Sequence, residues 1–210
     1  MQKQTRIVMA MLALAIVMAS AGATGQIQTK ATVEQIRKEL MQLPYYGVFD
    51  FLAFGYDRGK VTLMGYAYHP GLKRDAARAV KRVGGVDEVV DKIEELPPSQ
   101  ADDELRWKVY YAIYRDPALA RYAPGGGLLW GHRHAYNGGF FPLGSGPFTG
   151  FEPAGDYPIH IIVKNLRGML YGVVDNESDR KLAEFKAREV PGSLGVENNL
   201  VVESSRSTRR

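Results

Sequence analysis

The sequence predicts an α+β protein built from two α-β-β-α-β modules, each a small three-stranded mixed sheet with two helices on one face. The first observation is that residues 60–93 contain a β-rich run ending on Gly, a turn, an amphipathic helix and a second β-rich run. The second is that a degenerate copy of the same order occupies residues 167–202. In each copy the helix carries the chain back across the sheet, so the second and third strands should run parallel. The chain therefore repeats one unit.

The spacing between the two copies is regular in the first strand and the helix. Four pairs keep an offset of 107 residues, namely Val61, Leu63, Gly65 and Val83 against Gly168, Leu170, Gly172 and Val190. The dipeptide Gly85-Val86 matches Gly195-Val196 at an offset of 110. This predicts a three-residue insertion at 191–193, where Pro, Gly and Ser favour a turn.

The repeated unit resembles the BON domain, a module of bacterial envelope and osmotic-stress proteins. The family pattern is V-T-L-x-G, a helix, and then G-V-x-x-V-x-x-x-[IL], and residues 61–65 and 85–93 fit it closely. The second copy departs from the pattern at Met169, Tyr171 and Asn199. The resemblance implies a periplasmic protein that binds phospholipid surfaces and supports envelope integrity or osmotic-stress tolerance.

The N-terminal segment, residues 1–23, has the pattern of a secretory signal peptide. Lys3 and Arg6 precede an apolar run over 7–17, and small residues follow at 21–23. A retained membrane anchor is the competing interpretation, but spanning a bilayer takes about 20 apolar residues. The chain has no cysteine, which excludes a disulfide framework and a lipidated signal-peptide cysteine. We expect a periplasmic protein after cleavage of the signal peptide.

The charge of the chain argues against nucleic-acid binding. The formal net charge is +4, yet residues 24–203 carry 22 basic and 23 acidic side chains. A nucleic-acid-binding domain would normally present an excess of basic side chains. The remaining charge lies in the signal peptide and in the basic tail 204–210, which we expect to be disordered.

The first module is expected over residues 30–96. Thr32 and Gln35 have the spacing of a capping box at the start of a helix that Pro44 ends. A hairpin over 49–67 follows, and then a second helix over 71–83. The outer face of this second helix is basic and is our candidate for contact with anionic lipid headgroups, through Lys73, Arg74, Arg78, Lys81 and Arg82. The competing interpretation is that these side chains form the polar face that any surface helix must expose.

The second module is expected over residues 101–203, with an insertion at 124–158. The insertion contains ten glycines, five prolines and seven aromatic residues, and it follows a helix rich in aromatic residues. A loop of more than about 15 residues in a compact domain is normally functional or disordered. Contact with a membrane or partner, a lid on the domain's own aromatic helix, and disorder are the open alternatives. The candidate contact residues are Trp107, Tyr111, Trp130, Phe140, Phe141, Phe148 and Phe151.

The motifs of common active sites are missing from the sequence. Residues 125–127 are followed by Leu-Leu-Trp and not by the Lys and hydroxyl of a phosphate-binding loop. His132 and His134 supply only two metal ligands, and the sequence has no Gly-x-Ser-x-Gly elbow. We therefore predict no enzyme activity, no metal, no cofactor and no small-molecule substrate. The expected partner is an anionic membrane surface, and the alternative is a structural adaptor that binds another envelope protein through the insertion.

Overall fold

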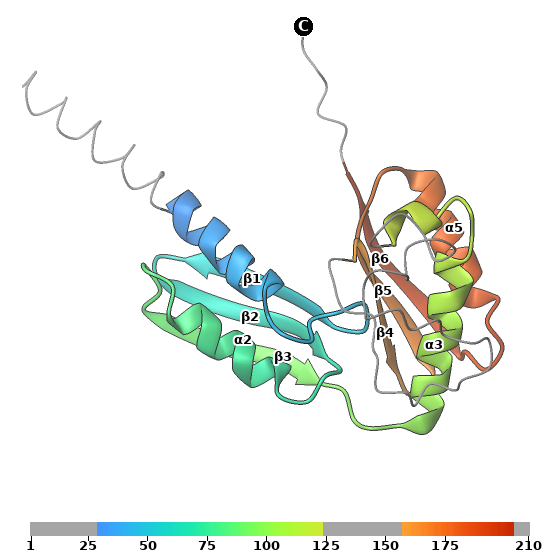
Figure 1. Ribbon diagram of the computed structural model, residues 1–210, viewed down its shortest axis with the longest axis horizontal. Helices are drawn as coiled ribbons and strands as arrows, with labels where there is room; N and C mark the ends of the chain where they lie inside the picture. Colours follow the sequence, from blue (N-terminus) through green and yellow to red (C-terminus); the bar gives the residue numbers. More distant parts are fainter. Residues whose placement is uncertain (1–28, 124–156, 204–210) are drawn as a thin grey trace, which may run out of the picture.

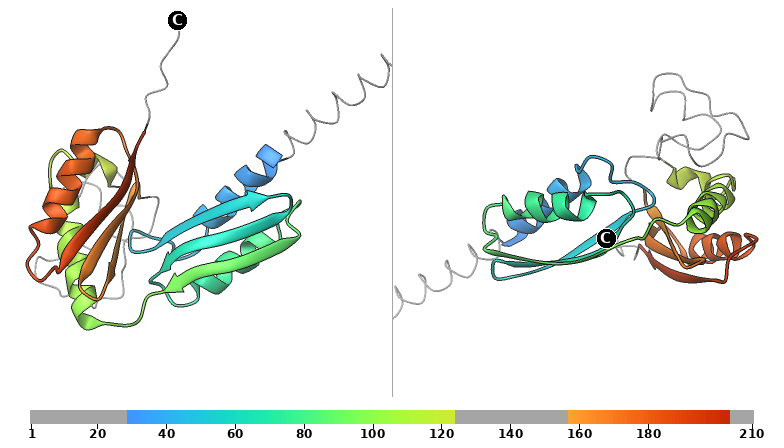
Figure 2. Two further views of the ribbon diagram at one scale, coloured as in Figure 1. Left: turned by 180° about the vertical axis from the view of Figure 1, so that it is seen from behind. Right: turned by 90° about the horizontal axis from the view of Figure 1, so that it is seen from below.

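The computed structural model describes residues 29–123 and 157–203, which form two three-stranded sheets with helices on one face of each (Figures 1 and 2). In the first module a helix over 29–41 precedes β1 (Phe51–Asp57), β2 (Lys60–Ala67), α2 (Leu72–Lys81) and β3 (Glu88–Glu95). The second module contains α3 (Gln100–Tyr114), the 3₁₀ turn η1 (Ala120–Tyr122), β4 (Ile159–Lys164), β5 (Arg167–Val174), α5 (Glu177–Arg188) and β6 (Gly195–Val202). The predicted α+β class and the two-module architecture are confirmed.

Both sheets have the same topology. β1 pairs with β2 in antiparallel fashion, and β2 pairs with β3 in parallel across the α2 crossover. β4, β5 and β6 repeat this arrangement, with α5 as the crossover helix. In the first module both helices pack on the same face of the sheet. The first helix buries Ile36 and Leu40 there, and α2 buries Leu72 and Ala76.

The two copies are in fact related by one offset throughout, and the predicted insertion at 191–193 is wrong. In the first sheet Val61 lies opposite Val89, and in the second sheet Gly168 lies opposite Val196. The third strands therefore also correspond at 107 residues. Gly85 and Gly192 hold the turn after each helix with φ values of 86° and 95°. Gly85-Val86 and Gly195-Val196 have the same sequence but occupy different places in the fold.

The glycine that ends the V-T-L-x-G pattern has a steric explanation in both modules. Gly65 has φ 123°, and a Cβ atom there would lie 1.9 Å from the backbone oxygen of Phe51. Gly172 has φ 125°, and its Cβ would lie 1.9 Å from the backbone oxygen of Pro158. Only glycine permits both this left-handed backbone and the close approach of the neighbouring strand.

The start of the first helix also differs from the prediction. The helix already includes residues 29–31, so Thr32 is not its N-cap. The Thr32 hydroxyl instead donates to the backbone oxygen of Gly84, 52 residues away. The capping-box prediction is therefore wrong, because a tertiary contact uses the hydroxyl.

A loop of the first module completes the core of the second. Val48 and Phe49 are buried in the cluster formed by α3, α5 and the second sheet. The backbone oxygen of Val48 accepts a hydrogen bond from the N–H of Ile161 at 2.8 Å, at the outer edge of β4. Residues Ile159 to Val163 of β4 are all buried, and since side chains alternate along a strand, both of its faces are covered.

Three predicted segments lie outside the described residues. They are the signal peptide at 1–23, the basic tail at 204–210, and the insertion apart from its last two residues. No helix within residues 29–123 and 157–203 has the length and apolar character needed to cross a membrane.

Candidate functional site

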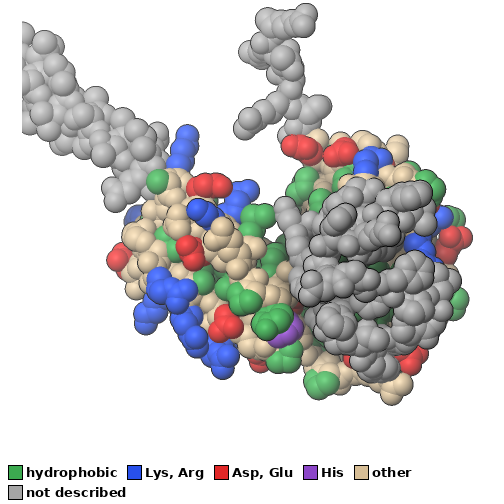
Figure 3. Space-filling model, in the orientation of Figure 1, with side chains coloured by type: hydrophobic (Ala, Val, Ile, Leu, Met, Phe, Trp, Pro, Cys, Tyr) green, Lys and Arg blue, Asp and Glu red, His purple; other side chains and the backbone are tan. Residues whose placement is uncertain are grey.

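α2 and its C-cap residue carry five basic side chains, of which Lys73 is half-buried and the other four are exposed. We call them the basic surface: Lys73, Arg74, Arg78, Lys81 and Arg82. Helical spacing places them there because Leu72, Ala76 and Val80 point into the core on the opposite side. Figure 3 shows basic side chains gathered over α2 at the lower left of the molecule. Arg74, Arg78 and Lys81 thus lie on one face of the helix, with Lys73 and Arg82 on its two flanks, and their role in lipid binding stays a prediction.

The basic surface is only partly neutralised. Asp75 is its one acidic neighbour on the helix, and its Oδ1 lies 3.5 Å from Arg74 Nε and 3.8 Å from an Arg78 terminal nitrogen. Within the part of the chain that the structure describes, Lys73, Lys81 and Arg82 have no ion pair. No carboxylate within the described ranges thus neutralises these three side chains.

A stacked pair of rings lies beside the N-terminal end of α2. Tyr45 and His69 stack with ring centroids 4.3 Å apart and an interplanar angle of 2°. The His69 backbone oxygen accepts a hydrogen bond from the N–H of Leu72, the first residue of α2. Tyr45 is 66% exposed, and sequence reasoning assigned it no role.

The two described members of the predicted aromatic contact surface are half-buried. Trp107 packs edge-on against Phe49, with centroids 5.1 Å apart, and Tyr111 lies 5.9 Å from Trp107. Arg115 stands over the Tyr111 ring at 4.3 Å. Trp107 therefore takes part in the packing between α3 and the first module, and Tyr111 packs beside it. Trp130, Phe140, Phe141, Phe148 and Phe151 lie outside the described residues.

Three further tyrosines of the second module are held neutral by their surroundings. Burial raises the pKa of Tyr110, Tyr114 and Tyr157. The Tyr114 hydroxyl donates to the backbone oxygen of Ile159 at 2.6 Å, which ties α3 to β4. Because burial raises each pKa above the ordinary value of 10, the three hydroxyls stay protonated at neutral pH and the rings serve packing.

A buried carboxylate organises the loop that enters the second module. Asp50 accepts hydrogen bonds from the backbone N–H groups of Gly47, Tyr68 and His69. Its burial raises its pKa, and the three N–H groups oppose this effect. The carboxylate fixes the turn that presents Val48 and Phe49 to the second core.

Two more polar side chains fasten the junction from the second module. Arg106 is 1% exposed, donates to the backbone oxygen of Val163 at 2.9 Å and stands over the Tyr68 ring at 4.2 Å. The Nδ1 atom of His160 is within hydrogen-bonding distance of the backbone oxygen of Gly47, at 3.1 Å. Sequence reasoning missed Asp50, Arg106 and His160 because their partners on other elements lie 18 to 114 residues away in the chain.

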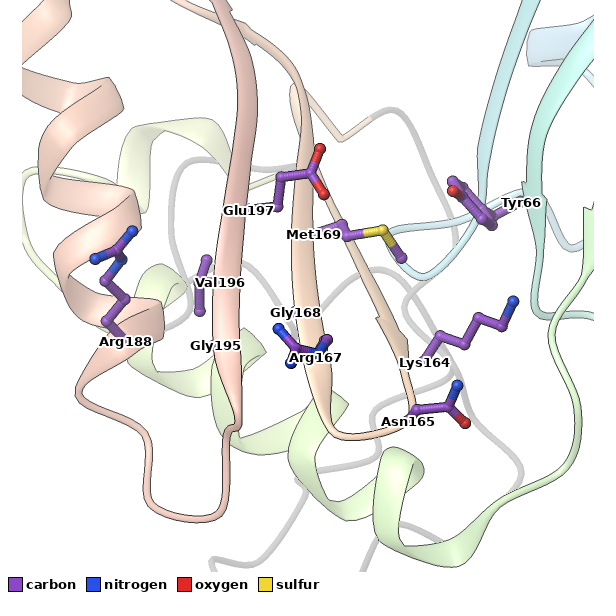
Figure 4. Close-up of a pocket in the computed structure, with 10 residues that line it drawn as sticks. All are labelled: Tyr66, Lys164, Asn165, Arg167, Gly168, Met169, Arg188, Gly195, Val196 and Glu197. Carbon is purple, nitrogen blue, oxygen red and sulfur yellow. The ribbon is translucent and has the colours of Figure 1, made fainter.

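A groove of about 620 Å³ opens between the two sheets (Figure 4). Its lining includes Tyr66 of β2, Lys164 at the end of β4 and Asn165 of the turn that follows. Met169 and Glu197 line it from β5 and β6. Lys164 forms an ion pair with Glu94, and this pair raises the Lys164 pKa. The groove thus mixes charges of both signs, so we assign it no ligand.

Residues 29–123 and 157–203 contain no group of three or more His, Asp or Glu side chains that could hold a metal ion. His132 and His134, the pair considered from the sequence, lie outside these ranges.

Comparison with known proteins gives a family match in both modules. The model of the BON domain family matches residues 55–97 and 155–204. A search of curated proteins gives no match. Two solved structures are similar in part, both of CdsD, a structural protein of the type III secretion system of Chlamydia trachomatis. Their sequences are 13% and 12% identical to this chain, and both have a TM-score of 0.24. The matched regions cover 83% and 82% of this chain and 93% and 97% of the respective CdsD chains. Scores this low support no conclusion from these two structures.

Proposed function

Because this chain contains two BON domains, we propose that it is an exported, non-enzymatic envelope protein that binds anionic phospholipid surfaces and supports envelope integrity or osmotic-stress tolerance. BON domains are in general non-enzymatic modules of envelope-associated proteins. The signal-peptide pattern at 1–23 supports export to the periplasm.

The basic surface of α2 is the observation that carries the lipid proposal. Each Lys or Arg near an anionic membrane contributes on the order of 1 kcal/mol, and the attraction decays over about 8 Å at physiological ionic strength. Arg74, Arg78 and Lys81 share one helix face at i, i+4 and i+7 and can approach a flat charged surface together, while Lys73 and Arg82 flank this face. The first helix and α2 lie on the same face of the sheet, so that no strand separates the basic surface from such a membrane (Figure 2).

Co-sedimentation with vesicles tests this proposal. The protein should bind vesicles that contain phosphatidylglycerol and should not bind vesicles of phosphatidylcholine alone. The triple variant Arg74→Gln, Arg78→Gln, Lys81→Gln should lower the affinity at low salt at least tenfold, since three cations of about 1 kcal/mol each are removed. The far-ultraviolet circular dichroism spectrum should not change.

A matched control separates the basic surface from net charge. Lys108, Lys181 and Arg188 are exposed basic residues on helices of the second module. Changing these three to Gln removes the same charge and should leave vesicle binding within about twofold of the unaltered protein. If both triple variants lose binding equally, the attraction depends on net charge and not on α2.

The second candidate function is that of a structural adaptor that binds another envelope protein through the insertion at 124–158. Its support is the presence of seven aromatic residues in that segment, because aromatic side chains are enriched at protein interfaces. Failure to bind vesicles of either composition would favour the adaptor.

A further inference from the structure

Tyr45 combines an uncommon backbone with an uncommon exposure. Its φ of 69° is in the left-handed region, which a bulky residue other than glycine rarely adopts. Its ring is 66% exposed and contacts the ring of His69. A conformation of this kind costs free energy, and such strain is concentrated at functional sites.

The position of Tyr45 links it to the basic surface. His69 lies three residues before Leu72, the first residue of α2, and the N-cap residue Gly71 has φ 89°. The Arg74 guanidinium covers Gly71, with a terminal nitrogen 3.2 Å from where a Cβ would be. The stacked rings and the first arginine of α2 are therefore neighbours in space.

A second exposed apolar side chain lies close to Tyr45 in the chain. Met41 is the last residue of the first helix and is 48% exposed. The turn from this helix to Tyr45 is short, with a hydrogen bond from the N–H of Tyr46 to the oxygen of Leu43. The segment from the end of the first helix to Tyr45 thus carries two exposed apolar side chains, and Tyr45 stacks on the turn that Arg74 also contacts.

We propose that Tyr45 and Met41 enter the headgroup region of an anionic bilayer while the basic surface of α2 contacts the phosphates. Tyrosine suits this place because its ring is apolar and its hydroxyl stays hydrated. The charge of the neighbouring side chains favours an anionic bilayer over an apolar protein groove, which would have to bury those cations at a cost. The inference rests on the proposed function and adds the orientation of the first module on the membrane.

A single-cysteine label tests the orientation, because the chain has no cysteine of its own. The variant Tyr45→Cys is labelled with a fluorophore that responds to polarity. The matched control is Met64→Cys on β2, where the methionine is 42% exposed. Leu63 and Ala67 of the same strand, which are one and three residues away, face the helices. Side chains alternate along a strand, so Met64 lies on the sheet face away from the helices.

The two labels are compared on phosphatidylglycerol vesicles in samples that are also sedimented. We expect the label at position 45 to shift to shorter wavelength and to be quenched by lipids with brominated acyl chains, and the label at position 64 to do neither. If the labelled protein sediments with vesicles but the label at 45 is unaffected, or if both labels respond alike, the inference is wrong and the proposed function stands. If the protein does not sediment with vesicles at all, both are wrong.

A second comparison separates a membrane role from a structural role for Tyr45. Tyr45→Gly relieves the left-handed strain, so its Tm should be equal to or above that of the unaltered protein. Its affinity for anionic vesicles should fall about fivefold, while Tyr45→Phe keeps it within about twofold. A lower Tm together with unchanged vesicle affinity in Tyr45→Gly would overturn the inference and leave the residue a structural role only.

Discussion

The hydrogen bond from the N–H of Ile161 to the backbone oxygen of Val48, at 2.8 Å, joins a loop of the first module to the edge strand of the second. An open strand edge is a liability for unwanted pairing, and this bond protects part of β4. Phe49 follows directly and is buried in the second core. The two modules therefore share one packed junction.

Substitution of Phe49 tests how far the junction couples the modules. Phe49→Ala should lower the free energy of unfolding by about 3–5 kcal/mol, because it leaves a cavity among Trp107 and Tyr110. Equilibrium unfolding in urea, followed by tryptophan fluorescence and by circular dichroism, checks this. The exposed Phe185 provides the control, and Phe185→Ala should change the free energy by less than about 1 kcal/mol. An equal effect of the two substitutions would contradict the shared junction.

The glycines of the repeated strand give a second prediction. Gly172→Ala should destabilise the second module by at least about 3 kcal/mol, since its Cβ would overlap the Pro158 oxygen at 1.9 Å and its φ is 125°. The control is Gly55→Ala on β1, where a Cβ meets no atom within 4 Å and φ is not positive. That substitution should be neutral or slightly stabilising. Thermal unfolding of the two variants compares them directly.

Local patterns in the sequence predicted the elements and the basic surface because they depend on spacing within one helix or strand. The alternation of apolar and basic residues in 71–83 fixes which face of α2 is buried, whatever the helix packs on. The junction could not be predicted in this way. Arg106 contacts Val163 and His160 contacts Gly47, and such pairs leave no periodic signal in the chain.

Two errors in the sequence prediction have physical causes. The offset of 110 came from matching the letters of Gly85-Val86 and Gly195-Val196, whereas strand register pairs Val89 with Val61 and Val196 with Gly168. The expected cap at Thr32 failed because its hydroxyl bonds to Gly84. In both cases a contact between distant segments determined the outcome.

Replacing residues 125–155 by a short Gly-Ser linker tests the insertion. If the insertion is a contact surface, we expect both modules to stay folded and binding to lipid or a partner to be lost. Removing a buried aromatic cluster would instead cost several kcal/mol of stability. Urea unfolding and vesicle co-sedimentation of the same variant distinguish the two. A loss of stability with binding retained would assign the segment to the core of the second module.

The pH dependence of stability should carry a contribution from Asp50. Burial raises the pKa of this carboxyl above its ordinary value of 3.8 in the folded protein, so the folded state holds the proton more strongly than the unfolded state. The protonated form therefore stabilises the fold below pH 3.8, and this contribution is lost as pH rises from there through the raised pKa. The amide that Asp50→Asn introduces cannot ionise, and its oxygen can still accept from the N–H groups of Tyr68 and His69. The free energy of unfolding of the unaltered protein minus that of Asp50→Asn, measured in urea at pH 3 to 7, should fall across this window and then level off. A difference that rises with pH would mean that the three backbone N–H groups outweigh burial and lower the pKa of Asp50.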